Sequence, residues 1–126
     1  MLLSMENIMA KTVIHLFNDN DAALTAGSHV AERVRQVAAE RNVELEVFLF
    51  GPAQAALTAP SEAPARLAFK AQIAELAKAG VRVGACINAA NSAGTANELQ
   101  SRGIALEFAR DAFVRFGLEA AAVLTF

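Results

Sequence analysis

The chain has 126 residues, a formal net charge of −2, and a hydrophobic fraction of 55% against 19% charged residues. This length fits one domain, and the charge excludes the basic patch that direct nucleic-acid binding requires. No stretch approaches the roughly 18 apolar residues of a membrane span. The one cysteine cannot form an intramolecular disulfide, so a secreted, oxidising setting is not indicated. We therefore expect a cytoplasmic protein that binds neither nucleic acid nor membranes.

The first part of the chain predicts a tail, a strand and a helix. Residues 1–11 lack the charged start and sustained apolar run of a signal peptide, and we expect a poorly ordered tail. Residues 12–17 predict a strand, and the polar segment 18–21 predicts a turn that begins a helix ending near Asn42. The expected buried face of this helix carries small and β-branched residues at helical spacing: Ala23, Ala26, Val30, Val34 and Val37.

The next strand is expected at residues 43–50. Its start alternates, with Glu44 and Glu46 on one side, which indicates one solvent-exposed face or an edge position. A helical turn is expected at 53–57. Residues 58–64 contain two prolines and predict a surface loop, either a plain connection or a lid.

The second half continues the alternation of helices and strands. A helix is expected at 65–79, with Phe69, Ile73, Leu76 and Ala77 buried. Further expected elements are a strand at 81–86, a small and polar segment at 87–94, a short helix opened by a capping box at Thr95–Glu98, a strand at 104–107, a helix at 110–116 and a strand at 120–126. This order predicts a single-domain α/β fold, with a mainly parallel five-stranded sheet and helices on both faces.

Cys86 stands where chemistry is expected, because ligands bind beyond the carboxyl ends of parallel strands. If the following residues turn helical at once, their amides favour the reactive thiolate. A free cysteine can equally be a buried small hydrophobe, so both interpretations stay open. Asp19 and Asp21 follow the first strand and would disfavour a thiolate close to them.

Other polar residues are weaker indicators of a functional site than Cys86. Asn18 and Asn88 follow strands and are candidate binding residues, although asparagine also favours ordinary turns and caps. His15 lies inside a strand and is expected to pack in the core or an interface rather than act as a base. The chain has no spaced Cys, His and carboxylate set and no glycine-rich nucleotide motif. We therefore expect neither a metal nor a cofactor.

The segment AGVRVGACINAA, residues 79–90, resembles the cysteine region of the DsrE/DsrF-like family and is most similar to its TusD-like branch. Residues 47–51 resemble the family's second strand and turn, and residues 112–126 its last helix and strand. The resemblance implies one DsrE-like domain over residues 1–126 with flavodoxin-like layering, and a homo-oligomer, trimer or hexamer. It also implies that Cys86 carries a persulfide, received from a sulfur donor protein and passed to an acceptor protein.

Two segments depart from the TusD-like pattern. Ser92-Ala93 replace a pair of arginines, and segment 18–21 is acidic where that branch has an uncharged glycine-rich loop. The leading hypothesis is a sulfur-relay carrier of the sulfurtransferase type that uses Cys86 alone. The alternatives are a non-catalytic oligomeric module that binds a small ligand or a protein at the strand-end crevice, and a redox sensor. Because Phe108, Phe113 and Phe116 cluster near the C-terminus, we also expect an oligomer to cover some of them.

Overall fold

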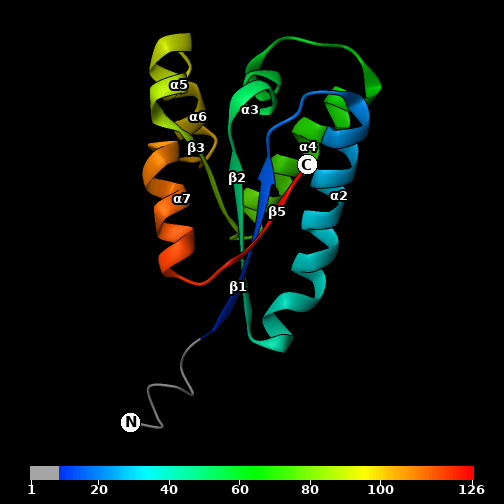
Figure 1. The fold of residues 1–126 in the computed structure, drawn as a ribbon. Helices are drawn as coiled ribbons and strands as arrows, with labels where there is room; N and C mark the ends of the chain where they lie inside the picture. Colours follow the sequence, from blue (N-terminus) through cyan, green and yellow to red (C-terminus); the bar gives the residue numbers. More distant parts are fainter. Residues whose placement is uncertain (1–8) are drawn as a thin grey trace, which may run out of the picture.

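The computed structural model describes residues 9–126 and shows one parallel sheet between two layers of helices (Figure 1). The strands lie in the order β4-β3-β2-β1-β5, and every neighbouring pair is parallel. Their bounds are Ala10–Leu16 (β1), Val43–Leu49 (β2), Arg82–Cys86 (β3), Ala105–Glu107 (β4) and Ala122–Thr125 (β5). The predicted fold class is therefore confirmed.

The helices connect successive strands and divide between the two faces. They are α2 (Asp21–Ala38), the short 3-10 turn η1 (Ala39–Arg41), α3 (Gly51–Thr58), α4 (Pro64–Lys78), α5 (Ile87–Ala93), α6 (Ala96–Ser101) and α7 (Ala109–Leu118). Figure 1 shows α2 and α4 on one side of the sheet and α7 on the other. The small and polar segment 87–94 is thus largely helical. The predicted capping box at Thr95 is wrong, because its backbone has φ −109° and ψ 5°, and its side chain caps no amide.

The face under α2 and α4 holds an aliphatic core. Phe69, Ile73 and Leu76 are buried there as predicted. The buried face of α2 differs from the prediction, because Ala26 is exposed and Val34 only half-buried. The cause is Gly27, where a Cβ atom would lie 2.2 Å from Leu16. The helix approaches the sheet closely at this glycine. A prediction based on the spacing of larger apolar residues does not detect such a contact.

The opposite face is covered by α7 and combines aromatic and ionic contacts. Phe48 of β2 packs edge-on against Phe113 and Phe116 of α7, with ring centroids 5.8 and 5.9 Å apart. This cluster also contains Cys86 and the small residue Ala112. A single helix thus covers this side, and the edge strand β5 is exposed along its whole length.

Glu46 lies in the middle of this ionic contact and is fully buried, contrary to the predicted solvent-exposed face. Its carboxylate is 2.7 Å from Lys11 Nζ and 2.6 Å from Arg115 Nη2, so it joins β1, β2 and α7. Burial by itself raises the pKa of Glu46. Hydrogen bonds from Arg115 and Lys11 outweigh burial and hold the pKa below its ordinary value. Because β2 lies in the interior of the sheet, the predicted edge position is also wrong.

Lys11 corrects the predicted extent of the tail. The strand begins at Ala10, and Lys11 is buried against Glu46 and Glu119 instead of belonging to a disordered segment. A buried ammonium is stable here because the carboxylates pair with it; hydrogen bonds to them outweigh burial and raise the pKa of Lys11. The remainder of the predicted tail, residues 1–8, lies outside the described residues.

Candidate functional site

Cys86 is the last residue of β3, and α5 begins at the next residue. Its side chain lies on the α7 face and is 4% exposed, packed with Phe48, Ala109 and Ala112. The condition set for a favoured thiolate, a helix that starts directly after Cys86, is therefore met. The helix has only seven residues, and the Cys86 side chain makes no hydrogen bond to its amides. The thiol thus lies beside the helix start without capping it.

Gln54 of α3 holds the backbone of Cys86 from the side. Its Nε2 donates to the Cys86 carbonyl at 3.0 Å, and its Oε1 accepts from the Cys86 amide at 2.9 Å. Strand β2 ends at Leu49. The side-chain amide of Gln54 therefore makes the hydrogen bonds to Cys86 that a further residue of β2 would make. Gln54 is itself 4% exposed, which shields both bonds from water. The backbone that carries the thiol is therefore fixed on both sides.

A hollow of about 370 Å³ opens beside the thiol, where the ends of β2, β3 and β4 meet. The residues that line it come from these strand ends and the helices after them: Phe50, Cys86, Asn88, Phe108, Ala109 and Arg110. Arg110 supplies the one positive charge among these lining residues, and none of them is acidic. Its guanidinium lies 5.6 Å from the centre of the Phe108 ring and 3.0 Å from Asp111. The hollow thus combines an apolar wall, an amide and a cation around one thiol.

The structure brings Asn88 to this hollow but not Asn18. Asn88 is exposed on α5 and lines the hollow with Cys86. Asn18 follows β1, where its backbone amide donates to the Phe126 carbonyl at 3.1 Å. The acidic residues Asp19 and Asp21 do not line the hollow either, and Asp19 pairs with Arg66 of α4 at 3.6 Å. The negative charges that were predicted to disfavour the thiolate of Cys86 therefore lie away from the hollow.

His15 lies on the same face of the sheet but apart from the hollow. Its Nδ1 is 3.1 Å from Thr125 Oγ1, and its ring packs edge-on against Phe113 with centroids 5.0 Å apart. Its Nε2 is buried and finds no hydrogen-bond partner among residues 9–126. Burial lowers the pKa of His15, which keeps the ring neutral. The expected packed role agrees with this position, although only one of its two nitrogens is satisfied.

Two residues of the site were absent from the sequence-based set. Arg110 had only a partial signal, because the sequence places it just after a strand but does not show that this strand, β4, lies beside β3. Gln54 had none, since a side chain that bonds backbone groups 32 residues away leaves no local pattern.

Within residues 9–126, no three His, Cys, Asp or Glu side chains gather in a way that could hold a metal ion. None of the helices described in this range combines the length and apolar character needed to cross a membrane. The hollow contains one thiol, that of Cys86, and a thiol acts as a nucleophile only when ionised.

Comparison with known proteins identifies the family. Solved structures with similar folds include a conserved protein of unknown function from Bacteroides thetaiotaomicron (15% identity, TM-score 0.70, covering 92% of this chain and 94% of that one). They also include a protein of unknown function from Methanobacterium thermoautotrophicum (22%, 0.68, 93% and 99%) and the ychN protein of E. coli (20%, 0.63, 94% and 98%). None of the curated proteins matches the sequence. The family model of the DsrE/DsrF-like family matches residues 11–126, nearly the whole chain, and the protein therefore belongs to the DsrE/DsrF-like family.

Proposed function

We propose that this protein is a sulfur carrier that accepts a sulfur atom on Cys86 and passes it to a partner protein. Membership of the DsrE/DsrF-like family supports an association with sulfur relay at the level of the family. The observation that carries the specific proposal is the single thiol in the hollow between Asn88 and Arg110. In this proposal the carrier needs no metal and no cofactor, because the sulfur arrives already activated.

The transfer is a pair of thiol exchanges. The Cys86 thiolate attacks the terminal sulfur of a donor persulfide, R–S–SH, forming Cys86–S–SH and releasing the donor thiolate, R–S⁻. An acceptor thiolate then attacks the terminal sulfur of Cys86–S–SH, which leaves the acceptor as a persulfide and restores the Cys86 thiolate. No net oxidation occurs, and one cysteine suffices. The chain contains only this one.

The charge of the hollow supports the proposal. A persulfide is more acidic than a thiol and is carried as an anion, which a nearby guanidinium stabilises. Arg110 is the cation in position to do so, and its own partner Asp111 is exposed, so solvent screens that pair. Asn88 can donate an amide hydrogen to the same anion. The carrier hypothesis therefore assigns Cys86 the sulfur, and Arg110 and Asn88 its stabilisation.

A second candidate function has its own observation. Cys86 is almost completely buried and belongs to an apolar cluster with Phe48 and Phe116. A thiol in such surroundings is typical of a packing residue. The chain would then be a non-catalytic module whose strand-end hollow binds a small ligand or a partner protein.

Mass spectrometry after incubation with glutathione persulfide separates the two functions. We expect the folded protein to gain the mass of one sulfur atom, and a thiol acceptor such as dithiothreitol to remove it. Cys86→Ser should fold normally and gain nothing. Arg110→Gln should load more slowly, while Arg33→Gln, an exposed arginine outside the hollow, should load as the unmodified chain does.

Alkylation supplies the outcome that contradicts the carrier. If the folded thiol resists iodoacetamide at neutral pH and reacts only after unfolding in urea, Cys86 is a packing residue. The non-catalytic module would then be the function that the hollow supports. Equal reaction of Arg110→Gln and the unmodified chain would remove Arg110 from the proposal but leave Cys86 in it.

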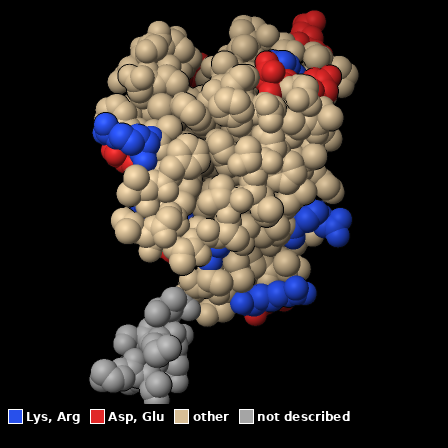
Figure 2. Space-filling model, in the orientation of Figure 1, with Lys and Arg blue, Asp and Glu red and all other residues tan. Residues whose placement is uncertain are grey.

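We also propose that the chain assembles with copies of itself through α7 and β5. Figure 2 shows a broad face over α7, β5 and α2 with charged side chains only toward its margins. The α7–β5 patch consists of the exposed apolar residues on it: Phe113, Val114, Leu118, Val123 and Leu124. Of these, Leu118 is the most exposed, at 85%. An apolar helix face beside an unpaired edge strand is a typical site of association.

A further inference from the structure

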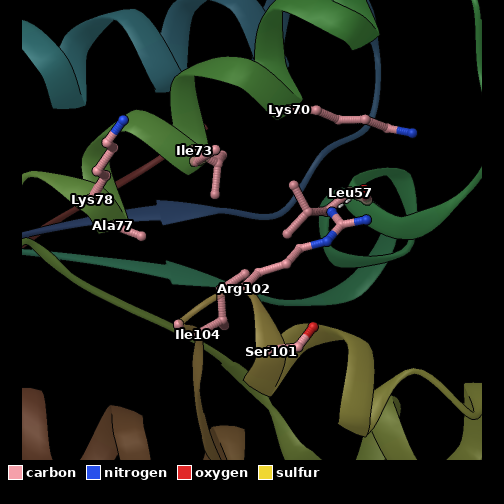
Figure 3. Close-up of a pocket in the computed structure, with 10 residues that line it drawn as sticks. Leu57, Lys70, Ile73, Ala77, Lys78, Ser101, Arg102 and Ile104 are labelled. Carbon is pink, nitrogen blue, oxygen red and sulfur yellow. Dashed lines mark hydrogen bonds between the residues drawn. The ribbon is translucent and has the colours of Figure 1, made fainter.

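A second hollow lies on the other side of the sheet from Cys86. It measures about 480 Å³ and opens between α4 and the end of α6 (Figure 3). Leu57, Ile73 and Ile104 form its floor, and all three belong to the aliphatic core under α4. The volume falls within the roughly 300–1,000 Å³ of small-molecule sites. The sheet separates this hollow from the sulfur chemistry proposed above.

Small residues keep this hollow open on the α4 side. Ala74 and Ala77 line it, and Gly103 lies where the chain turns from α6 toward β4. Figure 3 shows Ile73 and Leu57 directed into the space, with the Arg102 side chain stretched from the end of α6 toward Leu57. An exposed alanine beside buried aliphatic residues leaves an apolar surface that water covers poorly. The hollow therefore offers an apolar body a place to bind.

The lining residues also carry positive charge without negative charge. Lys70, Lys78 and Arg102 line the hollow, and none of its lining residues is acidic. Among the ion pairs found in residues 9–126, none involves Lys70 or Lys78. Arg102 pairs with the exposed Glu98. The hollow thus has an excess of cations over carboxylates.

Two of these cations converge on one end of the hollow. Arg102 Nη1 donates to the Leu57 carbonyl at 3.3 Å, and Lys70 Nζ donates to the Ala59 carbonyl, so both lie at the carboxyl end of α3. These bonds use one donor hydrogen of the ammonium and one of the guanidinium, and Arg102 Nη2 donates a second to Glu98. Each group keeps further N–H groups for a ligand. Lys78 stands at the other end of the hollow in Figure 3.

We propose that this hollow binds a small amphiphilic anion, a carboxylate with an unbranched apolar chain. The chain lies over Leu57, Ile73 and Ile104, and the carboxylate binds at the end where Lys70 and Arg102 meet. Apolar burial supplies affinity, and hydrogen bonds from two cations fix the orientation of the head group. Neither part gives the full affinity alone, because the cations are solvated and the apolar floor is small.

Calorimetric titration with decanoate, below the concentration at which it forms micelles, tests the proposal. We expect saturable binding of decanoate, weaker binding of decanol, and no binding of acetate. Amide shifts in nuclear magnetic resonance spectra should centre on α4 and on the turn at Gly103. Cys86→Ser should bind decanoate as the unmodified chain does. Failure of the sulfur-carrier proposal would therefore leave the decanoate site standing, and absence of decanoate binding would leave the sulfur-carrier proposal standing.

Two pairs of variants locate the site. Ala74→Phe should fill the hollow and abolish binding, while Ala71→Phe, at an equally exposed alanine of α4 outside the hollow, should not. Lys70→Gln should weaken decanoate by about tenfold and leave decanol unchanged, while Arg33→Gln should change neither. The absence of decanoate binding, unaltered binding by Ala74→Phe, or shifts centred on the α7–β5 patch would each overturn the proposal.

Discussion

The two faces of the sheet are built from different chemistry. Under α2 and α4 the contacts are aliphatic and the core is closed by two long helices. Under α7 the contacts are aromatic and ionic, one helix covers the sheet, and the thiol, the buried carboxylate of Glu46 and the unsatisfied histidine nitrogen all lie there. Both faces stabilise the fold, and the α7 face also carries the thiol, the buried ion pairs and the exposed apolar patch.

This division has a physical reason. An aliphatic core of packed side chains tolerates no buried charge without a partner, so the buried charges gather on the face where ion-pair partners are present. The α7 face pairs its charges with each other and leaves its apolar residues at the rim exposed.

Association should distinguish the faces most strongly. Light scattering should show the unmodified chain as a species at least twice as heavy as one chain. Leu118→Glu on α7 should reduce it to a monomer, because a charge in an apolar interface loses its solvation. Leu67→Glu, an exposed leucine of α4, should leave the assembly unchanged. A monomeric unmodified chain, or equal effects of the two variants, would contradict assembly through the α7–β5 patch.

Loss of the buried carboxylate should have the largest effect on stability. Glu46→Gln removes the fully buried carboxylate from Lys11 and Arg115 and leaves them the half-exposed Glu119 as their shared partner, so the free energy of unfolding should fall by about 3–5 kcal/mol in urea titration. Glu44→Gln is the matched control on the same strand. Its exposed carboxylate is 3.7 Å from Lys11, and its loss should cost less than about 1 kcal/mol. Similar losses in both would mean that burial of Glu46 contributes little.

The aliphatic face should respond in proportion to burial. Ile73→Ala should lower the free energy of unfolding by about 2–4 kcal/mol, since Ile73 is buried on α4 and the variant leaves a cavity. Val34→Ala should lower it by only about 1 kcal/mol, because Val34 of α2 is half-buried. Denaturation curves with the opposite order would show that α2 packs by the predicted face rather than by Gly27.

The smallest effect should be a pH dependence from His15. Burial lowers its pKa below the ordinary 6.5, so the unfolded chain takes up a proton first as the pH falls. The resulting stability is present above about pH 6.5 and is lost as the pH falls from there through the lower pKa of the folded protein. His15→Gln should flatten the change in unfolding free energy between about pH 7.5 and about pH 5.5, and His29→Gln, at an exposed position, should not. An unchanged slope in His15→Gln would assign the pH dependence to other groups.

Much of the fold could be predicted because its elements carry local patterns. The amphipathic helix before Gly80 and the strand that ends at Cys86 are recognisable from periodicity and turn residues. The alternation of such helices and strands along the chain predicts a parallel sheet. Helix α5 was missed because the asparagine and serine residues in segment 87–94 also favour turns. The buried face of α2 was predicted wrongly because the helix approaches the sheet at Gly27, next to Leu16 of β1, and the sequence of the helix alone does not show this contact.

The site was predictable only in part. The position of Cys86 at a strand end follows from the strand pattern, and Asn88 follows from its nearness in sequence. Which strand ends meet depends on the order of strands, and residue patterns do not contain that order. For this reason Asn18 was grouped with Cys86, and Arg110, at the end of neighbouring β4, was omitted.

The bond between Gln54 and Cys86 has a consequence for how this protein can change during evolution. The hydrogen bonds of Gln54 go to the backbone amide and carbonyl of residue 86, so they do not depend on which side chain stands there. A lineage can lose or regain the thiol without disturbing the end of β3. Residue 54 has no such freedom, because glutamate lacks the donor and leucine lacks both groups. We expect substitutions at these two positions to arise independently, with residue 54 the slower to change.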